Sequence, residues 1–177
     1  MKNNKGETKD MKIAGFYDES ISNGLGWRAV LFVSGCPHNC PGCHNKVAQS
    51  FDYGEEFNES QIIERIKENS ILSGITVSGG EPLCKENIAE VNKFIENVRK
   101  EKPGFNVWCY TGYTLEELKN RNDDITNETL KNIDVLVDGR FVESRKNPEI
   151  KFRGSDNQRI LDLKKCLKEN KIVELEV

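Results

Sequence analysis

Short apolar segments recur along the chain, and each is followed by a polar or glycine-rich stretch. They are rich in β-branched and aromatic residues, which predicts short strands separated by turns and loops. The predicted strands are residues 11–16, 27–33, 75–77, 105–110, 133–137 and 159–161, and a last apolar run covers 172–177. Residues 22–26, Ser-Asn-Gly-Leu-Gly, indicate a turn between the first two strands.

Apolar residues spaced three and four apart predict helices between several of these strands. The clearest such pattern covers residues 88–98 and ends before Pro103, which cannot continue a helix. Two further helices are predicted to begin at Asn58 and Thr114, because each is followed three residues later by Gln or Glu, as in a capping box. A Lys-rich helix is predicted at 163–168.

Strands that alternate with helices and have continuously apolar interiors are typical of a parallel sheet covered by helices. Too few strands are predicted for a closed (β/α) barrel. We therefore predict an α/β fold, namely a partial, open (β/α) barrel with a mostly parallel sheet, in a single domain. Ligands of such folds bind at the carboxyl ends of the strands, so four loops are expected to meet on one face. These loops follow Val33, Val77, Tyr110 and Val137.

Composition and charge narrow the class of protein. The chain has 177 residues, of which 36% are hydrophobic and 31% charged, as expected for one globular domain with a polar surface. Its 26 basic and 29 acidic residues leave a formal net charge of −3, so no basic surface for nucleic acid is expected. The longest apolar run, 29–33, is far below the roughly 18 residues of a membrane span.

The first ten residues are polar and are predicted to be a disordered N-terminal extension, 1–10, followed by one domain, 11–177. They hold no apolar segment of the kind found in signal peptides. We therefore expect a cytoplasmic protein without a membrane partner. In that reducing compartment a disulfide framework is not expected.

Six cysteines are divided between a cluster and isolated positions. Three of them lie alone in the sequence and are interpreted as core or surface thiols: Cys84, Cys109 and Cys166. The other three follow the second predicted strand with the spacing C-x3-C-x2-C: Cys36, Cys40 and Cys43. Three thiolates this close together can surround one compact metal centre, so this loop is the main candidate for chemistry.

Two kinds of metal centre compete for this loop. Zinc would need a fourth ligand, and His44 is available, although adjacent residues such as Cys43 and His44 rarely bind one ion comfortably. A four-iron cluster normally takes four cysteines, so three would leave one iron open to a substrate or cofactor. We favour the open cluster, with structural zinc and metal-free thiols as the alternatives.

The cysteine loop and a second motif together resemble the radical S-adenosylmethionine superfamily. The second motif is Gly79-Gly80-Glu81-Pro82, directly after the strand predicted at 75–77. In that superfamily the cysteines hold a [4Fe-4S] cluster whose open iron binds the amino and carboxylate groups of S-adenosylmethionine. The reduced cluster cleaves this cofactor to methionine and a 5′-deoxyadenosyl radical.

The resemblance implies which residues bind the cluster and the cofactor. Its metal ligands would be Cys36, Cys40 and Cys43. Its cofactor-binding residues would be Gly42, Cys43, His44, Gly79, Gly80 and Glu81, with Glu81 as a partner of the ammonium group. The glycines would let the backbone approach the ligand, so valine at Gly80 is expected to weaken cofactor binding and to spare the cluster. No catalytic side chain is expected beyond the cluster ligands.

Further segments narrow the resemblance to one family of activating proteins. They are 23–28, 32–36, 40–43, 110–113, 135–141 and 152–159. Together they are similar to the family that activates the anaerobic ribonucleoside-triphosphate reductase. The resemblance implies that the radical takes a hydrogen atom from a glycine of that reductase, with a reducing flavodoxin or ferredoxin-type protein as electron donor. The alternatives are an activase of pyruvate formate-lyase or another glycyl-radical enzyme, and a non-catalytic zinc-binding module.

Five residues near these motifs carry further expectations. His38, between two of the cysteines, is expected to be exposed to solvent. Asp138 and Arg140 follow a strand end, where they either contact a ligand or form an Asp-Gly turn with a surface arginine. Arg153 and Arg159 are expected to help form the mouth of the barrel and to contact the partner or the cofactor.

Overall fold

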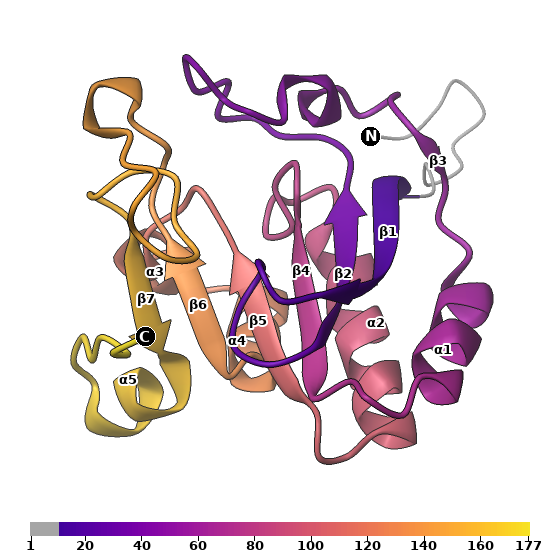
Figure 1. Ribbon diagram of the computed structural model, residues 1–177. Helices are drawn as coiled ribbons and strands as arrows, with labels where there is room; N and C mark the ends of the chain where they lie inside the picture. Colours follow the sequence, from indigo (N-terminus) through magenta and orange to yellow (C-terminus); the bar gives the residue numbers. More distant parts are fainter. Residues whose placement is uncertain (1–10) are drawn as a thin grey trace.

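One mixed sheet connects seven strands in the computed structural model, which describes residues 11–177 (Figure 1). The strands lie in the order β3-β1-β2-β4-β5-β6-β7. Their bounds are β1 Lys12–Ser20, β2 Arg28–Val33, β3 Glu55–Glu56, β4 Gly74–Gly79, β5 Asn106–Tyr110, β6 Val135–Asp138 and β7 Arg159–Asp162. The run at 172–177 contains an isolated bridge, from Glu174 to Leu161, in place of a strand. The extension predicted at 1–10 lies outside the described residues.

Five α-helices and two short 3-10 turns complete the described part of the chain. Their bounds are α1 Glu59–Glu68, α2 Ile88–Glu101, α3 Leu115–Lys119, α4 Asp124–Asn132, α5 Leu163–Glu169, η1 Lys46–Gln49 and η2 Glu143–Arg145. The predicted helix starts are confirmed, because Asn58 caps α1 and Thr114 forms a complete capping box with Glu117. Helix α4, capped by Asp123, was not predicted. Among the described residues, no helix is long and apolar enough to cross a bilayer.

The α/β class is confirmed, but the sheet is only partly parallel, so the prediction of a mostly parallel sheet is wrong. Strands β2, β4, β5 and β6 run parallel, whereas β1, β3 and β7 are antiparallel to their neighbours. The cause lies in the connections, because residues 21–27 and 139–158 contain no α-helix that would return the chain to its starting end. The sheet has two separate edges, β3 and β7, and a barrel is not confirmed.

Alternating side chains give the sheet two apolar faces. On one face, Ile75 and Val77 of β4 belong to the same core as Ile95 of α2. On the opposite face, a smaller apolar cluster surrounds Trp108, whose ring meets that of Phe152 at a centroid distance of 5.4 Å. Figure 1 shows α2 and α4 behind the sheet and the β1–β2 connection crossing in front of it. The side without helices is called the open face below.

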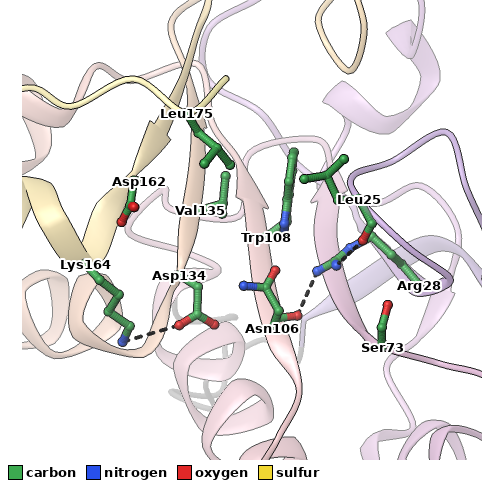
Figure 2. A pocket seen from close by; sticks show the side chains of 10 residues that line it. All are labelled: Leu25, Arg28, Ser73, Asn106, Trp108, Asp134, Val135, Asp162, Lys164 and Leu175. Carbon is green, nitrogen blue, oxygen red and sulfur yellow. Dashed lines mark hydrogen bonds and ion pairs between the residues drawn. The ribbon is translucent and has the colours of Figure 1, made fainter. Parts of the chain in front are cut away.

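A buried arginine lies on the open face near the amino ends of the parallel strands (Figure 2). Arg28 is 1% exposed, and its hydrogen-bond acceptors are neutral oxygens: Thr76 Oγ1 and the carbonyl groups of Leu25, Ile75 and Asn106. Burial lowers its pKa to about 10, which leaves the guanidinium charged at neutral pH. A cavity of about 450 Å³ lies beside it. This end of the sheet is opposite to the predicted ligand loops.

Candidate functional site

The cysteine loop begins where β2 ends, at the carboxyl ends of the parallel strands. Its start is folded back onto η1, because the Cys36 amide donates to Gln49 O at 3.0 Å. The Cys43 amide donates to Cys40 O at 3.3 Å, which closes a turn between two of the thiols. All three cysteines are half-buried and free. The loop therefore presents three thiols that do not serve the hydrophobic core.

These thiols form a donor set suited to iron. Burial raises the pKa of Cys36 to about 11 and also raises the pKa of Cys40. Without a metal both thiols are protonated near neutral pH, so they must lose protons to bind iron as thiolates. By residue type the three cysteines suit an iron–sulfur cluster, because thiolates are its usual protein ligands. In the described part of the chain, no three His, Cys, Asp or Glu side chains are gathered as a site for a single metal ion.

The three scattered cysteines are buried. Cys84, Cys109 and Cys166 are each at most 1% exposed. Burial raises the pKa of Cys84 to about 12 and also raises the pKa of Cys109. Buried thiols of this kind act as small apolar side chains. Of the two predicted environments, core or surface, the structure shows the core.

The turn after β4 packs directly against the cysteine loop. The Gly80 amide donates to Val33 O at 2.7 Å, and the Glu81 amide donates to Gly35 O at 2.7 Å. A Cβ atom at Gly80 would collide with Gly35 O and would lie 2.7 Å from Ala48 O. Contact between the two loops therefore requires glycine here. Glycine at position 80 thus has a structural role, in addition to the predicted one of letting a ligand approach the backbone.

Glu81 is completely buried, and protein donors occupy both of its carboxylate oxygens. Oε1 accepts hydrogen bonds from the Leu83 amide at 2.9 Å and from Thr111 Oγ1 at 2.7 Å. Oε2 accepts from the Gly112 amide at 2.7 Å and lies 2.8 Å from His38 Nε2. Four donors thus compensate the buried carboxylate for its lost water. The residue predicted to meet an ammonium group is already bound by three segments of the chain.

His38 is not exposed to solvent, so the prediction for this residue is wrong. Its side chain is only 5% exposed. Its ring packs edge-on against Tyr113, with the ring centroids 4.4 Å apart. The cysteine loop turns inward between its first two cysteines and places the imidazole against Glu81. No local sequence signal marks this contact, because the two residues are 43 positions apart.

Gly42 and His44 lie on the exposed side of the cysteine loop. His44 lines a hollow of about 250 Å³, and aromatic residues form part of its wall: Tyr17, Phe32 and Tyr53. Gly42 has a φ of +69°, and a Cβ atom there would lie 2.6 Å from the carboxyl carbon of Glu143. The open face therefore has an aromatic hollow directly after the third cysteine.

Asp138 and Arg159 form a buried ion pair. Arg159 Nη2 lies 2.6 Å from Asp138 Oδ2 and 2.7 Å from Glu116 Oε2. Asp138 is fully buried, so Arg159 neutralises a carboxylate that water does not reach. Arg140 is a surface arginine that pairs with Glu117 at 3.0 Å. Of the two predicted interpretations, the Asp-Gly turn with a surface arginine agrees with the structure.

Arg153 has a different environment, with no ion pair to any described residue. Its Nη1 donates to Gln158 O at 3.2 Å, and its Nε is buried without a partner. It lies in the connection 139–158, which rises above the carboxyl ends of the strands in Figure 1. The structure thus separates Arg153 from Arg159, although the sequence places both in one segment.

Asn87 and Thr111 support the site, and sequence reasoning missed both. Asn87 occupies the cap position of α2, but its side chain does not cap the helix. Its Nδ2 donates to Ser34 O at 2.9 Å and to Glu81 O at 3.1 Å, which ties the cysteine loop to the glycine turn. The sequence contained a signal for Thr111, because it belongs to the segment 110–113, which is one of those that resemble the family. It contained no such signal for Asn87, which resembles an ordinary helix cap.

Residues 22–161 match the family model described as "4Fe-4S single cluster domain". This range contains the whole cysteine loop and the glycine turn after β4. This match defines the class of this α/β protein as an iron–sulfur protein, and its three free thiols on one loop agree with that class.

Curated relatives identify the family within that class. The chain is 42% identical over 152 residues to the anaerobic ribonucleoside-triphosphate reductase-activating protein of Pasteurella multocida (strain Pm70), a match that covers 84% of this chain and 95% of the relative. The relative of the same name from Escherichia coli (strain K12) is 42% identical over 147 residues, with 81% and 93% covered. That from Enterobacteria phage T4 is 35% identical over 146 residues, with 81% and 89% covered. The chain belongs to the family of anaerobic ribonucleoside-triphosphate reductase-activating proteins.

Proposed function

We propose that this protein activates an anaerobic ribonucleoside-triphosphate reductase by generating a glycyl radical on it, with residues 11–177 as one radical S-adenosylmethionine domain. The observation that carries the proposal is the loop of three free cysteines, in a chain that matches activating proteins over 84% of its length. When bound and reduced, a [4Fe-4S] cluster supplies the electron that splits S-adenosylmethionine into methionine and a 5′-deoxyadenosyl radical, which abstracts the glycine hydrogen.

Cys36, Cys40 and Cys43 are the proposed cluster ligands. Each supplies one thiolate, and the half-buried position of all three keeps them reachable from solvent. Because a four-iron cluster has four irons to ligate, three thiolates leave one iron for the amino and carboxylate groups of S-adenosylmethionine. The role of these residues is therefore to hold the cluster and to leave one position free for the cofactor.

The remaining proposed cofactor residues surround the same loop. Gly42 and His44 lie on its exposed side, where the aromatic walls of the neighbouring hollow suit a nucleoside base. Gly79 and Gly80 are half-exposed, so we propose that their backbone contacts the methionine part of the cofactor. Glu81 is the proposed partner of the ammonium group. It can take that role only by exchanging or sharing one of its present hydrogen bonds.

The proposed substrate is a backbone glycine of the reductase, which must come into contact with the cofactor for hydrogen transfer. We propose that the partner approaches from the open face, below the connection 139–158. Arg153 supports this direction, because its guanidinium makes no ion pair to the described residues. A reducing flavodoxin or ferredoxin-type protein is the proposed electron donor. The six free cysteines are typical of a reducing compartment and support a cytoplasmic location.

Anaerobic purification and reconstitution test the proposal. The protein is expected to be brown, with about four iron and four sulfide per chain, and to cleave S-adenosylmethionine when reduced. It should produce a glycyl radical on the reductase, detected by electron paramagnetic resonance. Cys40→Ala should lose the cluster, whereas the matched control Cys166→Ala should keep it.

Three results would contradict this function. Zinc in place of iron in a colourless protein would favour a non-catalytic module. Full cluster occupancy in Cys40→Ala would show that the ligand set is wrong. A radical formed on pyruvate formate-lyase but not on the reductase would identify a different target.

A further inference from the structure

Three loops at the carboxyl ends of the strands meet at one buried carboxylate. Glu81 follows β4, His38 belongs to the cysteine loop after β2, and Thr111 and Gly112 follow β5. The side chain of Glu81 is 0% exposed and that of His38 is 5% exposed. Water therefore does not replace the hydrogen bond between these two side chains if it is lost.

The carboxylate of Glu81 depends on all of its donors. A carboxylate only accepts hydrogen bonds, so the imidazole of His38 donates through Nε2, at 2.8 Å. The other donors are the Leu83 amide, the Thr111 hydroxyl and the Gly112 amide. In a buried network, loss of one donor leaves an acceptor unsatisfied and weakens its neighbours. The hydrogen bond from His38 therefore helps to order the loop after β5 as well as the cysteine loop, to which His38 belongs.

The imidazole of His38 is held in place by its surroundings. Tyr113 packs edge-on against it, and the guanidinium carbon of Arg121 lies 4.2 Å from the centroid of the same tyrosine ring. At Gly112, a Cβ atom would collide with the imidazole. The absence of a side chain there gives His38 room to reach Glu81.

We propose that His38 is a positioning residue for the cluster, because its hydrogen bond to Glu81 orders the cysteine loop before iron is bound. The proposal rests on the proposed function, since it concerns the same three thiols. His38 lies two residues after Cys36 and two before Cys40, so a fixed imidazole restricts the backbone that carries both. A loop ordered in advance loses less conformational entropy when it binds its cluster.

Two substitutions of similar size separate the hydrogen bond from the volume of the ring. His38→Leu fills the space without a donor, whereas His38→Gln keeps an N–H group that can reach the carboxylate. Gly112→Ala is an independent variant, because its Cβ atom displaces the imidazole while His38 remains. Lys46→Ala is the control, since this residue is exposed and lies on η1, directly after the loop.

The first measurement uses cluster-free protein. Amide hydrogen exchange is followed by mass spectrometry in residues 36–43 and 110–113. His38→Leu and Gly112→Ala are expected to exchange at least about fivefold faster in both segments, because both lose a shared buried anchor. His38→Gln and Lys46→Ala should stay within about twofold of the unchanged protein.

The second measurement uses iron-loaded protein under anaerobic conditions, with a chelator added. The rate of iron release is expected to rise at least about fivefold in His38→Leu, and His38→Gln should restore a rate near that of the unchanged protein. Rescue by glutamine is the result that a purely space-filling role would not produce.

Either of two results would overturn the proposal. One is unchanged exchange in both segments for His38→Leu or, if that variant does not fold, for Gly112→Ala. The other is an equal effect of His38→Leu and His38→Gln, which would show that the shape of the imidazole ring matters and its hydrogen bond does not. Failure of the proposed function looks different, because the unchanged protein would then take up no iron. The exchange measurement on cluster-free protein would still decide the role of His38.

Discussion

At the scale of single residues, three buried charged groups are compensated in three different ways. Glu81 accepts hydrogen bonds from four donors, Asp138 is paired with Arg159, and Arg28 donates to neutral oxygens. Each arrangement compensates the charge for lost hydration, which would otherwise cost several kcal/mol. Substitution of the compensating partner should therefore matter more than substitution of any exposed charge.

Arg159→Ala is expected to destabilise the protein more than Arg153→Ala. Arg159→Ala leaves the fully buried carboxylate of Asp138 without its cation and should lower the free energy of unfolding by about 3 kcal/mol. Arg153→Ala breaks no ion pair to the described residues and should lower it by less than about 1 kcal/mol. Urea unfolding of the two cluster-free variants measures the difference. Equal stabilities would contradict the structural role of Arg159.

The effect of Arg153→Ala on activity should exceed its effect on stability. We expect it to lower the radical yield on the reductase more than it lowers cleavage of S-adenosylmethionine without the partner. Its guanidinium lies on the connection 139–158 and makes no ion pair to the described residues, so a partner could still pair with it. Equal losses in both assays would instead place Arg153 at the cofactor.

Glu116 is expected to make stability depend on pH in acid. Hydrogen bonds from Arg159 lower the pKa of Glu116 from 4.5 to about 2. Its contribution to the free energy of unfolding is therefore present above pH 4.5 and is lost as the pH falls towards about 2. The side chain is 53% exposed, so solvent screening limits the contribution to about 1 kcal/mol or less. Urea unfolding between these pH values should show a smaller loss in Glu116→Gln, and an identical loss would refute the assignment.

At the scale of elements, local patterns in the sequence correctly predicted the start of two helices that begin at a polar cap. Asn58 and Thr114 were predicted from the residue three positions later, and both cap their helices. Helix α4 was missed because its short apolar pattern, Ile125 and Leu130, lies in a polar stretch. Strand β7 was predicted, but its antiparallel direction was not. The direction depends on the end of the sheet to which the connection 139–158 leads the chain.

Gly80→Ala is expected to disturb the cysteine loop by contact between backbones. The new Cβ atom would collide with Gly35 O, so we expect a loss of about 2 kcal/mol in the free energy of unfolding and faster iron release from loaded protein. From the sequence, a larger residue at Gly80 was expected to spare the cluster, whereas the close contact with Gly35 O leads us to expect the opposite. Gly104→Ala is the matched control, because nothing lies within 4 Å of its Cβ position. An unchanged iron-release rate in folded Gly80→Ala would show that the loop tolerates the contact.

At the scale of the whole molecule, cluster binding and folding should be coupled. The folded chain holds three thiols on one ordered loop, and a ligand that binds only the folded state stabilises it. We expect iron-loaded protein to unfold about 5 °C or more above cluster-free protein in anaerobic thermal scans followed by circular dichroism. Cys43→Ala should show no such difference after the same iron treatment. Identical midpoints for loaded and cluster-free protein would argue against the coupling.

The sequence by itself determined the α/β class, most strands, the helix caps Asn58 and Thr114, and the loop that carries the chemistry. These features depend on residues a few positions apart, such as the spacing of Cys36, Cys40 and Cys43, so a local pattern is enough to predict them. The family resemblance rested on such local segments too, and the comparison with curated relatives confirmed it.

Only the tertiary structure decided which strands are antiparallel, where His38 points, and how the buried charges are compensated. His38 meets Glu81 across 43 positions, and Arg159 meets Glu116 across 43 as well. Such contacts carry no local pattern, because they form only when the tertiary fold brings segments far apart in the sequence to the same edge of the sheet. A buried carboxylate then takes whichever donors the fold places around it, since leaving it unsatisfied costs too much free energy.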